Sequence, residues 1–352
     1  IMKKKMMRCA SLTLVLVFLF VFAGGAAAAP KYQWRLACET IAGSIADLYA
    51  QEFSRLLKEK SNGDIQLDIF HSGTLGTPTE MFELTLNGAV EFCLTGPSQS
   101  SSIVPENQIM GLQFLFSDDP IVNRDFFAQS KALNVMLNDI YREKGLSVLS
   151  YFTEGAMFLT ANKAIRTPFD FKGVKIRVMP SELLVETYRA YGANPTPLSF
   201  TELYSGLQLN VVEGQENAPA TIQEMKFMDV QKFLIGSRHN MYVMQHLVNV
   251  GFLDSLPEDV RKIVLDSVDE VRPYIHDVQE ELNKTRLQMM IDDFKSGQEY
   301  YELTHEEREA FKEIAKKADA KYFELSRNPE FAKELLETFR AEMAELESKR
   351  GK

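Results

Sequence analysis

The N-terminal third of the mature chain alternates between two hydrophobic periods. Short apolar runs at residues 34–38, 65–70 and 90–94 predict strands, and apolar residues at helical spacing between residues 42 and 60 predict an amphipathic helix. Thr77 followed by Pro78 predicts the capped start of a second helix. The resulting order, β-α-β-α-β, is typical of an open parallel sheet with helices on both faces.

The same rhythm returns between residues 172 and 219. A β-branched run from Val174 to Val178 precedes a helical pattern over residues 182–191, a second helix, and a short strand predicted at Val211 and Val212. Polar residues stand at the ends of these strands. Because ligands of such sheets bind in the crevice at the carboxyl ends of the strands, this stretch is the predicted centre of the site.

A long helical pattern follows near the C-terminus, from Pro257 to about Lys295. A helix of about 39 residues would span about 58 Å, which exceeds the width of one compact domain. It should therefore bridge two lobes or be kinked, and Pro273 is the expected kink. Together these patterns predict an α/β fold of two lobes with a long helix across both.

The first residues have the pattern of a secretory signal peptide. Four basic residues precede an apolar run at residues 11–22, and Ala27 and Ala29 form a cleavage site of the A-x-A type. The apolar run is too short for a typical membrane span, although an uncleaved anchor is the alternative. We therefore expect residues 1–29 to be removed and the protein to act in the periplasm.

Removal of this segment takes away four positive and no negative charges, so the formal charge changes from −10 to −14. An acidic exported protein is a poor candidate for binding nucleic acid or anionic lipid. Two cysteines remain, Cys38 and Cys93, both in predicted strands. Adjacent strands rarely offer disulfide geometry, so we expect two buried free thiols.

Sequence motifs for catalysis, phosphate binding or metal binding are absent. The five histidines are scattered, and His239 and His246 would lie on opposite faces of a strand. We therefore expect no enzyme activity, no cofactor and no metal site.

Three residues of the central stretch are candidates for ligand contact. Arg177 lies inside a β-branched strand, where it is either an exposed or paired arginine or a carboxylate anchor. Asn217, just before Pro219, is either a turn residue or a cleft amide that both donates and accepts. Phe200 is either a core residue or a lid over a ligand.

From about Trp34 to its end, the chain resembles the substrate-binding proteins of the tripartite ATP-independent periplasmic (TRAP) transporters, of the dicarboxylate-binding type. The densest likeness is GVKIRV…GANPTPLSFTELYSGLQLNVVEGQEN, followed by QKFL, His239 and LPEDVRK. KSNGDIQL, HSGTLG and LQFLF add to it. The resemblance implies two lobes that close on a small-molecule ligand, with the long helix lying across both.

The resemblance also implies roles for single residues. Arg177 would be the carboxylate anchor, Asn217 the cleft asparagine and Phe200 the cleft aromatic. Glu39, at the end of the first strand, would be a polar ligand contact. The loop over residues 96–99, with Pro97 and Ser98, would face the ligand.

One departure narrows the expected ligand. Members that bind sialic acid carry a second cleft arginine where this chain has Met157, and a glutamate where it has Gly96 and Pro97. Both changes make the cleft less polar, so Met157 would cover an apolar part of the ligand. We therefore expect a monocarboxylate with an apolar or aromatic body, and a C4-dicarboxylate or a sugar acid as the alternative.

The resemblance implies a small and a large TRAP membrane subunit as partners, and we expect a monomer. A periplasmic ligand-binding sensor is the alternative role. We expect lobe I to comprise residues 30–154 and about 243–282. Lobe II would comprise residues 155–242 and about 283–352, including the C-terminal helices.

Overall fold

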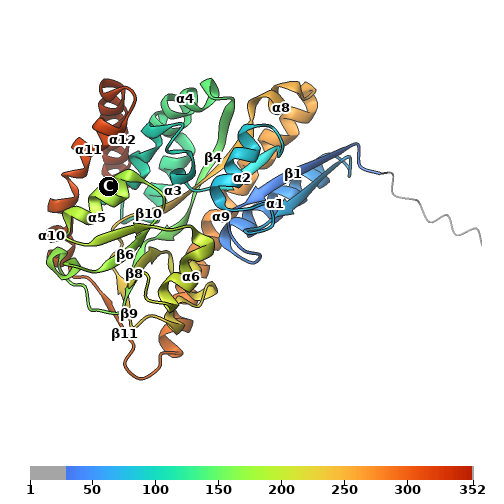
Figure 1. Ribbon diagram of the computed structural model, residues 1–352. Helices are drawn as coiled ribbons and strands as arrows, with labels where there is room; N and C mark the ends of the chain where they lie inside the picture. Colours follow the sequence, from blue (N-terminus) through green and yellow to red (C-terminus); the bar gives the residue numbers. More distant parts are fainter. Residues whose placement is uncertain (1–28, 351–352) are drawn as a thin grey trace, which may run out of the picture.

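The computed structural model describes residues 29–350, which form two α/β lobes, each built on its own sheet (Figure 1). All but the last residue of the expected signal peptide lies outside the described residues. Across residues 29–350, no helix combines the length and apolar character needed to cross a membrane. The predicted two-lobed α/β fold is confirmed.

The first lobe contains a five-stranded sheet in the order β2-β1-β3-β10-β4. Its strands are β1 (Tyr32–Cys38), β2 (Ile65–Phe70), β3 (Phe92–Thr95), β4 (Leu146–Ala156) and β10 (Met241–Asn249). β1 is parallel to β2 and β3, whereas β10 is antiparallel to β3 and β4. Cys38 and Cys93 lie on neighbouring strands as free, buried thiols, and burial raises the pKa of Cys38 to about 12.

Local capping fixes the first two helices at the edge of this sheet. Ser44 caps α1 (Ile45–Lys60) by accepting a hydrogen bond from the backbone N–H of Asp47. Thr77 and Glu80 form a capping box at the start of α2 (Pro78–Leu86), with Pro78 in the first turn. Both helices begin just after a strand ends, so the caps also position the strand-end loops.

The second lobe contains a six-stranded sheet in the order β11-β9-β5-β8-β6-β7. Its strands are β5 (Phe158–Ala161), β6 (Lys175–Val178), β7 (Asn194–Pro197), β8 (Gly214–Asn217), β9 (Phe233–Gly236) and β11 (Glu299–Glu302). β6 is parallel to β7 and β8, and β5 is antiparallel to β8 and β9. Its helices α5 (Glu182–Ala190), α6 (Phe200–Gln208) and α7 (Pro219–Glu224) alternate with these strands.

Strand β8 corrects the sequence prediction, which placed a strand at Val211 and Val212. Val211 is exposed in the turn after α6, and the strand begins at Gly214. A Cβ atom on Gly214 would come within 2.9 Å of the carbonyl oxygen of Thr160, so glycine permits the close approach of β5. Hydrophobic patterning missed this strand because it is buried yet reads Gly-Gln-Glu-Asn.

A second correction concerns the helix predicted from residues 118–119 to 144. It is divided into α3 (Pro120–Gln129), a π-helical segment (Ala132–Leu137) and α4 (Asn138–Glu143). The break lies at Ser130, whose hydroxyl donates to the carboxylate of Glu342. The same carboxylate accepts from the backbone N–H of Lys131, so a distant helix satisfies the polar groups freed at the break.

Two short connections join the lobes at their centre. Met157 stands alone between β4 of the first sheet and β5 of the second, and residues 237–240 connect β9 to β10. At the crossing, the backbone N–H of Met157 donates to the carbonyl of Asn240. The crossing point therefore lies directly beside one predicted site residue.

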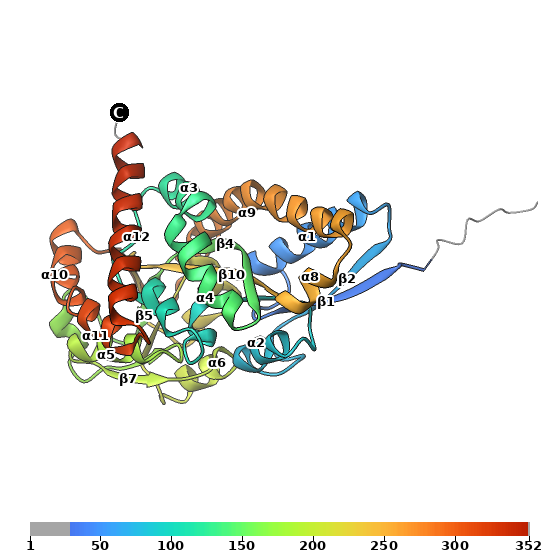
Figure 2. The same ribbon diagram turned by 90° about the horizontal axis from the view of Figure 1, so that it is seen from above.

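The long helix is α9 (Glu258–Asp292), with 35 residues and a span of about 52 Å. Val264, Val268 and Val271 bury its first half in the core of the first lobe, alongside α1 (Figure 2). Its second half packs against α7 of the second lobe. The helix continues through Pro273 as one segment, and the predicted bridge is confirmed.

The C-terminal helices do not all follow the predicted division into lobes. Leu335 and Phe339 of α12 (Pro329–Arg350) share a core with Phe126 of α3 and Leu133 of the first lobe. We expected about residues 283–352 to belong to lobe II, whereas the apolar face of α12 packs on α3. The other lobe boundaries stay a prediction.

The remaining helices are short and connect the elements above. They are α8 (Val250–Ser255), α10 (His305–Ala315), α11 (Ala318–Leu325), and the 3₁₀ turns η1 (Pro97–Ser100), η2 (Pro105–Gly111), η4 (Pro168–Phe171) and η5 (Phe227–Asp229). η1 and η2 follow β3 and lead toward the second lobe. They supply one wall of the site described next.

Candidate functional site

A small cavity lies where the two lobes meet, and we call it the cleft cavity. Pro97 and Ser98 of η1, Met157 at the crossing and Tyr242 of β10 line it, together with residues of η2 and the start of α5. Its volume is about 30 Å³, room for about two water molecules. The lobes are thus in a closed arrangement, and an organic molecule would have to enter from an opened form.

A polar contact holds the walls of the cleft cavity together. The Oε1 atom of Gln108 in η2 accepts from the hydroxyl of Ser181 at 3.0 Å and from the backbone N–H of Leu183 at 3.2 Å. Ser181 is also the N-cap of α5. The first lobe therefore contacts the capped start of a helix in the second, which favours the closed form.

The walls of the cleft cavity are otherwise rich in methionine. Met110, Met157, Met179 and Met241 all line it. Methionine is flexible and polarisable, so it adapts to apolar and aromatic groups of varied shape. This wall is suited to the apolar part of a ligand.

Arg177 lies in β6, directly before the methionine wall. Strand residues two positions apart face the same side, so Arg177 shares a face with Met179, which follows β6 and lines the cavity. Its side chain is 2% exposed, and its Nε donates to the carbonyl of Leu198 at 2.9 Å. The loop before α6 therefore holds the guanidinium in place.

The guanidinium of Arg177 forms no ion pair with any carboxylate between residues 29 and 350. Burial lowers its pKa from the ordinary value, while Tyr242, Glu216 and Glu39 nearby act in the opposite direction. A buried cation without a paired anion is costly. The structure therefore argues against an exposed or paired arginine, the two alternatives to a carboxylate anchor for Arg177.

Glu39 follows the last residue of β1 and is 3% exposed. Its carboxylate accepts from Thr95 Oγ1 at 2.6 Å, from the backbone N–H of Gly96 at 2.9 Å and from the hydroxyl of Tyr242 at 2.5 Å. Burial raises its pKa, and these donors and Arg177 counteract part of that effect. Three of about four lone-pair positions are occupied, so one remains for a ligand.

Tyr242 connects Glu39 to the cleft cavity. It lines the cavity and donates its hydroxyl proton to Glu39. Burial raises the pKa of this phenol well above its usual value, so it stays protonated and remains a donor. Its position at the start of β10, inside an apolar strand, gave no sequence signal of a site.

Asn217 and Phe200 occupy different settings. Asn217 ends β8, is 5% exposed, and donates to Gln215 Oε1 at 2.5 Å, while its register partner is Phe158 next to Met157. Phe200 begins α6, half-buried, and packs with the core of that helix. Leu198, two residues before Phe200, accepts a hydrogen bond from Arg177, so α6 begins close to Arg177. Neither Asn217 nor Phe200 lines the cleft cavity itself.

Of the seven predicted site residues, Met157, Pro97 and Ser98 line the cleft cavity. Glu39 does not line it but accepts a hydrogen bond from Tyr242, which does. Arg177 stands two residues before Met179, which also lines the cavity. Sequence reasoning missed Tyr242, Met179 and Gln108. Met179 could have been found from its spacing of two from Arg177.

Between the second sheet and α5, a buried hydrogen-bond network surrounds Glu216 of β8. His239 Nε2 lies 2.6 Å from its carboxylate, the hydroxyl of Tyr188 donates at 2.5 Å, and Ser237 Oγ lies 2.7 Å from His239 Nδ1. Every member is buried and partnered. The network joins β8, α5 and the crossing segment, which explains a structural histidine at this place.

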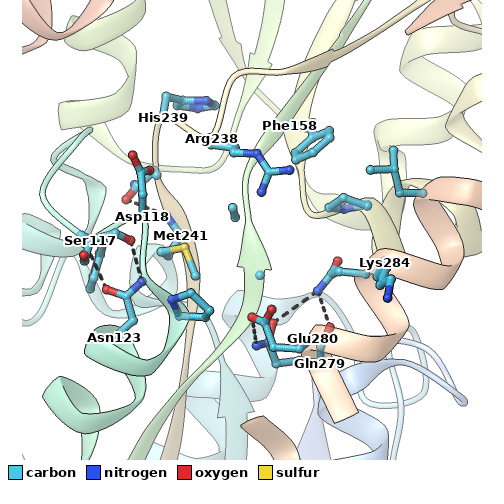
Figure 3. A pocket seen from close by; sticks show the side chains of 18 of the residues that line it. Ser117, Asp118, Asn123, Phe158, Arg238, His239, Met241, Gln279, Glu280 and Lys284 are labelled. Atoms are coloured by element: carbon cyan, nitrogen blue, oxygen red, sulfur yellow. Dashed lines mark hydrogen bonds between the residues drawn. The ribbon is translucent and has the colours of Figure 1, made fainter. Parts of the chain in front are cut away.

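A larger pocket of about 410 Å³ lies along the second half of α9, and we call it the α9 pocket (Figure 3). Asn240 and Met241 line both this pocket and the cleft cavity, so the crossing segment separates them. Two of the charged side chains in its wall are already paired. Arg238 binds Glu302 at 3.1 Å, and Asp118 binds Arg308 at 2.7 Å, which lowers the pKa of Asp118.

Metal binding finds no support in residues 29–350, where no group of three or more His, Cys, Asp or Glu side chains is placed to hold an ion. The geometry instead offers one buried cation, a buried carboxylate with spare accepting capacity, and an apolar wall between two closed lobes. This arrangement suits reversible capture of a small anion.

Comparison with known proteins agrees with that reading. Residues 37–325 match the family described as bacterial extracellular solute-binding protein, family 7 (DctP). The ectoine-binding periplasmic protein TeaA of Halomonas elongata is 33% identical over 328 residues, 92% of this chain and 94% of that protein. The ectoine/5-hydroxyectoine-binding periplasmic protein UehA of Ruegeria pomeroyi is 34% identical over 85% of this chain and 87% of that protein.

A solved TRAP periplasmic solute binding protein from Desulfovibrio salexigens, with bound orotic acid, has a TM-score of 0.84. It is 30% identical, over 90% of this chain and 99% of that chain. The match covers both lobes and the bridging helix. This chain is therefore a periplasmic solute-binding protein and not an enzyme. It belongs to family 7 of the bacterial extracellular solute-binding proteins, the substrate-binding proteins of TRAP transporters.

Proposed function

We propose that this protein captures a small monocarboxylate with an apolar or aromatic body and delivers it to a TRAP permease. Arg177 pairs with the carboxylate through two parallel hydrogen bonds. Asn217 and Glu39 bind the remaining polar groups, and Met157, Phe200 and the loop with Pro97 and Ser98 cover the body. Closure then excludes water and strengthens the ion pair.

The observation that carries this proposal is the buried guanidinium of Arg177. It is 2% exposed and has no carboxylate partner among residues 29–350. The closest acids cannot replace a ligand, because Glu39 and Glu216 are each engaged by several other donors. An anionic ligand would complete the missing pair.

The apolar body is supported by the cavity wall. Met157 and Met179 come from the second lobe, and Met110 comes from η2 of the first, so closure brings methionines together from both sides. A second ligand carboxylate would face this wall without a partner, at the cost of burying an unpaired charge. The wall therefore favours one charged group over two.

A second candidate ligand is a compact zwitterion of the ectoine type. Glu39 keeps one accepting position beside the cleft, which a cationic group could occupy while Arg177 binds the carboxylate. The two relatives described above, TeaA and UehA, are named as ectoine-binding proteins, which supports this candidate. This candidate differs from the first only in needing Glu39 as an anion.

Delivery follows from closure. The closed form, with Gln108 bound to the start of α5, would be selected by the small and large TRAP membrane subunits as a two-state population shift. We propose that the protein acts as a monomer in this cycle. A periplasmic sensor that passes the closed form to a receptor is the alternative role, and genes for membrane subunits beside this one would favour transport.

A thermal-shift panel tests the ligand class. The panel contains phenylpyruvate, phenylacetate, a branched 2-oxo acid, ectoine, succinate and sialic acid, each well above its dissociation constant so that binding raises Tm. We expect the aromatic or branched acids to stabilise the protein. Stabilisation by succinate or sialic acid alone would overturn the proposal.

Glu39→Gln distinguishes the two candidate ligands. The amide oxygen can still accept from Gly96 and Tyr242, the NH2 group takes the place of Oε2 and donates to the Thr95 hydroxyl, and the charge is lost. A simple carboxylate should bind this variant about as well as wild type, whereas ectoine should lose affinity because its cation no longer meets an anion. Calorimetry on both proteins gives the comparison, and mass spectrometry of co-purified small molecules supplies an independent identification.

A further inference from the structure

Glu154 is a buried carboxyl at the boundary of the two lobes that the proposed function does not use. It lies in β4, three residues before the crossing at Met157, and is 2% exposed. Its Oε2 accepts a long hydrogen bond of 3.4 Å from the hydroxyl of Thr221 in α7. Its Oε1 is buried without a hydrogen-bond partner in the described part of the chain.

The backbone around Glu154 is held at one point by α9. Asn283 donates its Nδ2 proton to the carbonyl of Glu154 at 2.7 Å and accepts from the backbone N–H of Ala220 at 3.0 Å. The next residue, Gly155, has φ of 120°, and a Cβ atom there would come within 2.4 Å of Asn283 Nδ2. One side chain of α9 thus joins β4 of the first lobe to α7 of the second, right beside the carboxyl.

The groups that face Glu154 are mostly acidic or neutral. From α7, Glu224 approaches and has its own buried, unpartnered Oε1. The end of β1 contributes Glu39 and Cys38, β10 contributes Tyr242, and the first turn of α1 contributes the backbone of Ala46, which favours the charged form of Glu154. Arg286 of α9 acts on Glu224 and offsets part of the effect of its burial.

This surrounding favours the protonated carboxyl. Burial, followed by the charge of Glu224, raises the pKa of Glu154 to about 8, and burial raises that of Glu224 to about 7. A protonated Glu154 is neutral and carries a donor, which suits a group wedged between acidic neighbours. An ionised one would be a buried charge beside the carboxyls of Glu224 and Glu39, opposed to a long hydrogen bond from Thr221 and the backbone of Ala46.

We propose that closing the lobes takes up a proton on Glu154, which makes the open–closed equilibrium depend on pH through a residue outside the ligand contacts. In the open form, α7 moves away with its lobe, water reaches the carboxylate, and the group is ionised at neutral pH. On closing, Thr221 and Glu224 approach, and the carboxylate accepts one proton from solvent. The inference rests on the proposed function, because it assumes that the lobes open and close.

The direction follows from proton linkage. The closed form binds the proton more tightly, so low pH favours closure, and the preference is lost as pH rises from the ordinary carboxyl pKa through the raised one, about 8. Ligand affinity should fall over the same range, because binding requires closure. The free energy of unfolding should fall there too, since the unfolded chain holds fewer protons than the native state.

The test measures lobe separation without any ligand, so its outcome is independent of the ligand class. Nitroxide labels on Glu83→Cys of α2 and Gln208→Cys of α6, both exposed, report the distance between lobes by double electron–electron resonance. Cys38 and Cys93 are buried, so labelling is confined to the introduced sites. The closed-to-open ratio should rise about tenfold or more between pH 9 and pH 6.

Glu154→Gln keeps the shape and removes the charge. Its closed-to-open ratio should not change with pH, and it should equal the ratio that the wild type has at low pH. Glu281→Gln, a matched change at an exposed position of α9 outside the α9 pocket, should keep the dependence of the wild type. A ratio that is constant with pH in the wild type, or an unchanged pH dependence in Glu154→Gln, overturns the inference. Failure of every acid in the thermal-shift panel would count against the proposed ligand and leave this measurement intact.

Discussion

The cleft cavity and the α9 pocket lie on two sides of one crossing segment, yet they differ in size and in charge pairing. The α9 pocket is more than ten times larger, about 410 Å³ against about 30 Å³. Arg238 and Asp118 in its wall are paired with Glu302 and Arg308. Beside the cleft cavity, Arg177 has no carboxylate partner within residues 29–350.

The difference teaches that charge pairing and volume point to different places, and that the proposed site rests on charge pairing. A binding protein in its closed form has contracted around the place of its ligand, so a small cavity there is expected. A groove beside a bridging helix can be large without any unsatisfied group to attract a ligand. An unpaired buried guanidinium marks the place where binding energy is available.

The largest effect that this comparison predicts is at Arg177. Arg177→Ala should cost about 2–5 kcal/mol of ligand affinity, as for truncating one partner of a buried charge pair. Arg177→Lys should also bind poorly, because an ammonium cannot form the two parallel hydrogen bonds of a guanidinium. Calorimetry with the acid that gives the largest thermal shift measures both.

Two outcomes would break the comparison at this point. Wild-type affinity in both variants would remove Arg177 from the site. Normal affinity in Arg177→Lys alone would show that charge suffices and that the fork geometry has no role. Unfolding of the ligand-free variants is the control, and Arg177→Ala should not be less stable, because it removes an uncompensated buried charge.

The next effect concerns the methionine wall. Met157→Arg introduces the second cleft arginine that the resemblance to sialic-acid-binding members implies at this place, but in a wall built from methionines. A monocarboxylate should bind this variant more weakly by about 1–3 kcal/mol, through overpacking and an unpaired second charge. Succinate or sialic acid should gain affinity relative to wild type in the same assay.

Met157→Leu is the matched control, since it keeps the volume and the apolar character. It should bind the monocarboxylate nearly as well as wild type. If Met157→Arg binds the monocarboxylate normally, Met157 does not face the ligand. The apolar selectivity would then belong to Met110 and Met179 from the other walls.

Much of the succession of strands and helices along the chain could be predicted from the sequence, because it depends on local periodicity. The first β-α-β-α-β unit and the bridging helix α9 are examples. β8 could not be predicted in place, because its residues are polar and buried only through contacts with β5 and β6. The division of the helix after Pro120 depends on Glu342, more than two hundred residues away.

The site shows the same division between local and distant information. The place of Arg177 inside an apolar strand made it a candidate ligand contact. Only the structure, through its burial and its lack of a carboxylate partner, favours a carboxylate anchor over a surface charge. The sequence did not indicate Tyr242, because aromatic residues are common in strands. Only the structure shows that its hydroxyl donates to Glu39. Glu154 gave no signal, since its neighbours come from α1, α7, α9 and the end of β1.

The smallest predicted effect is in the α9 pocket, and it tests the other half of the comparison. Lys284→Ala removes an exposed charge from its wall and should change ligand affinity by less than about 0.5 kcal/mol. A larger change would still not make the pocket a binding site. Its walls come from both lobes, with Ser117 and Asn123 on one side and Phe158 and Tyr300 on the other, so a group there can act on closure alone. The distance between the lobes, measured by double electron–electron resonance, separates the two cases, because a change in closure shifts affinity and lobe separation together, whereas a lost ligand contact shifts affinity only.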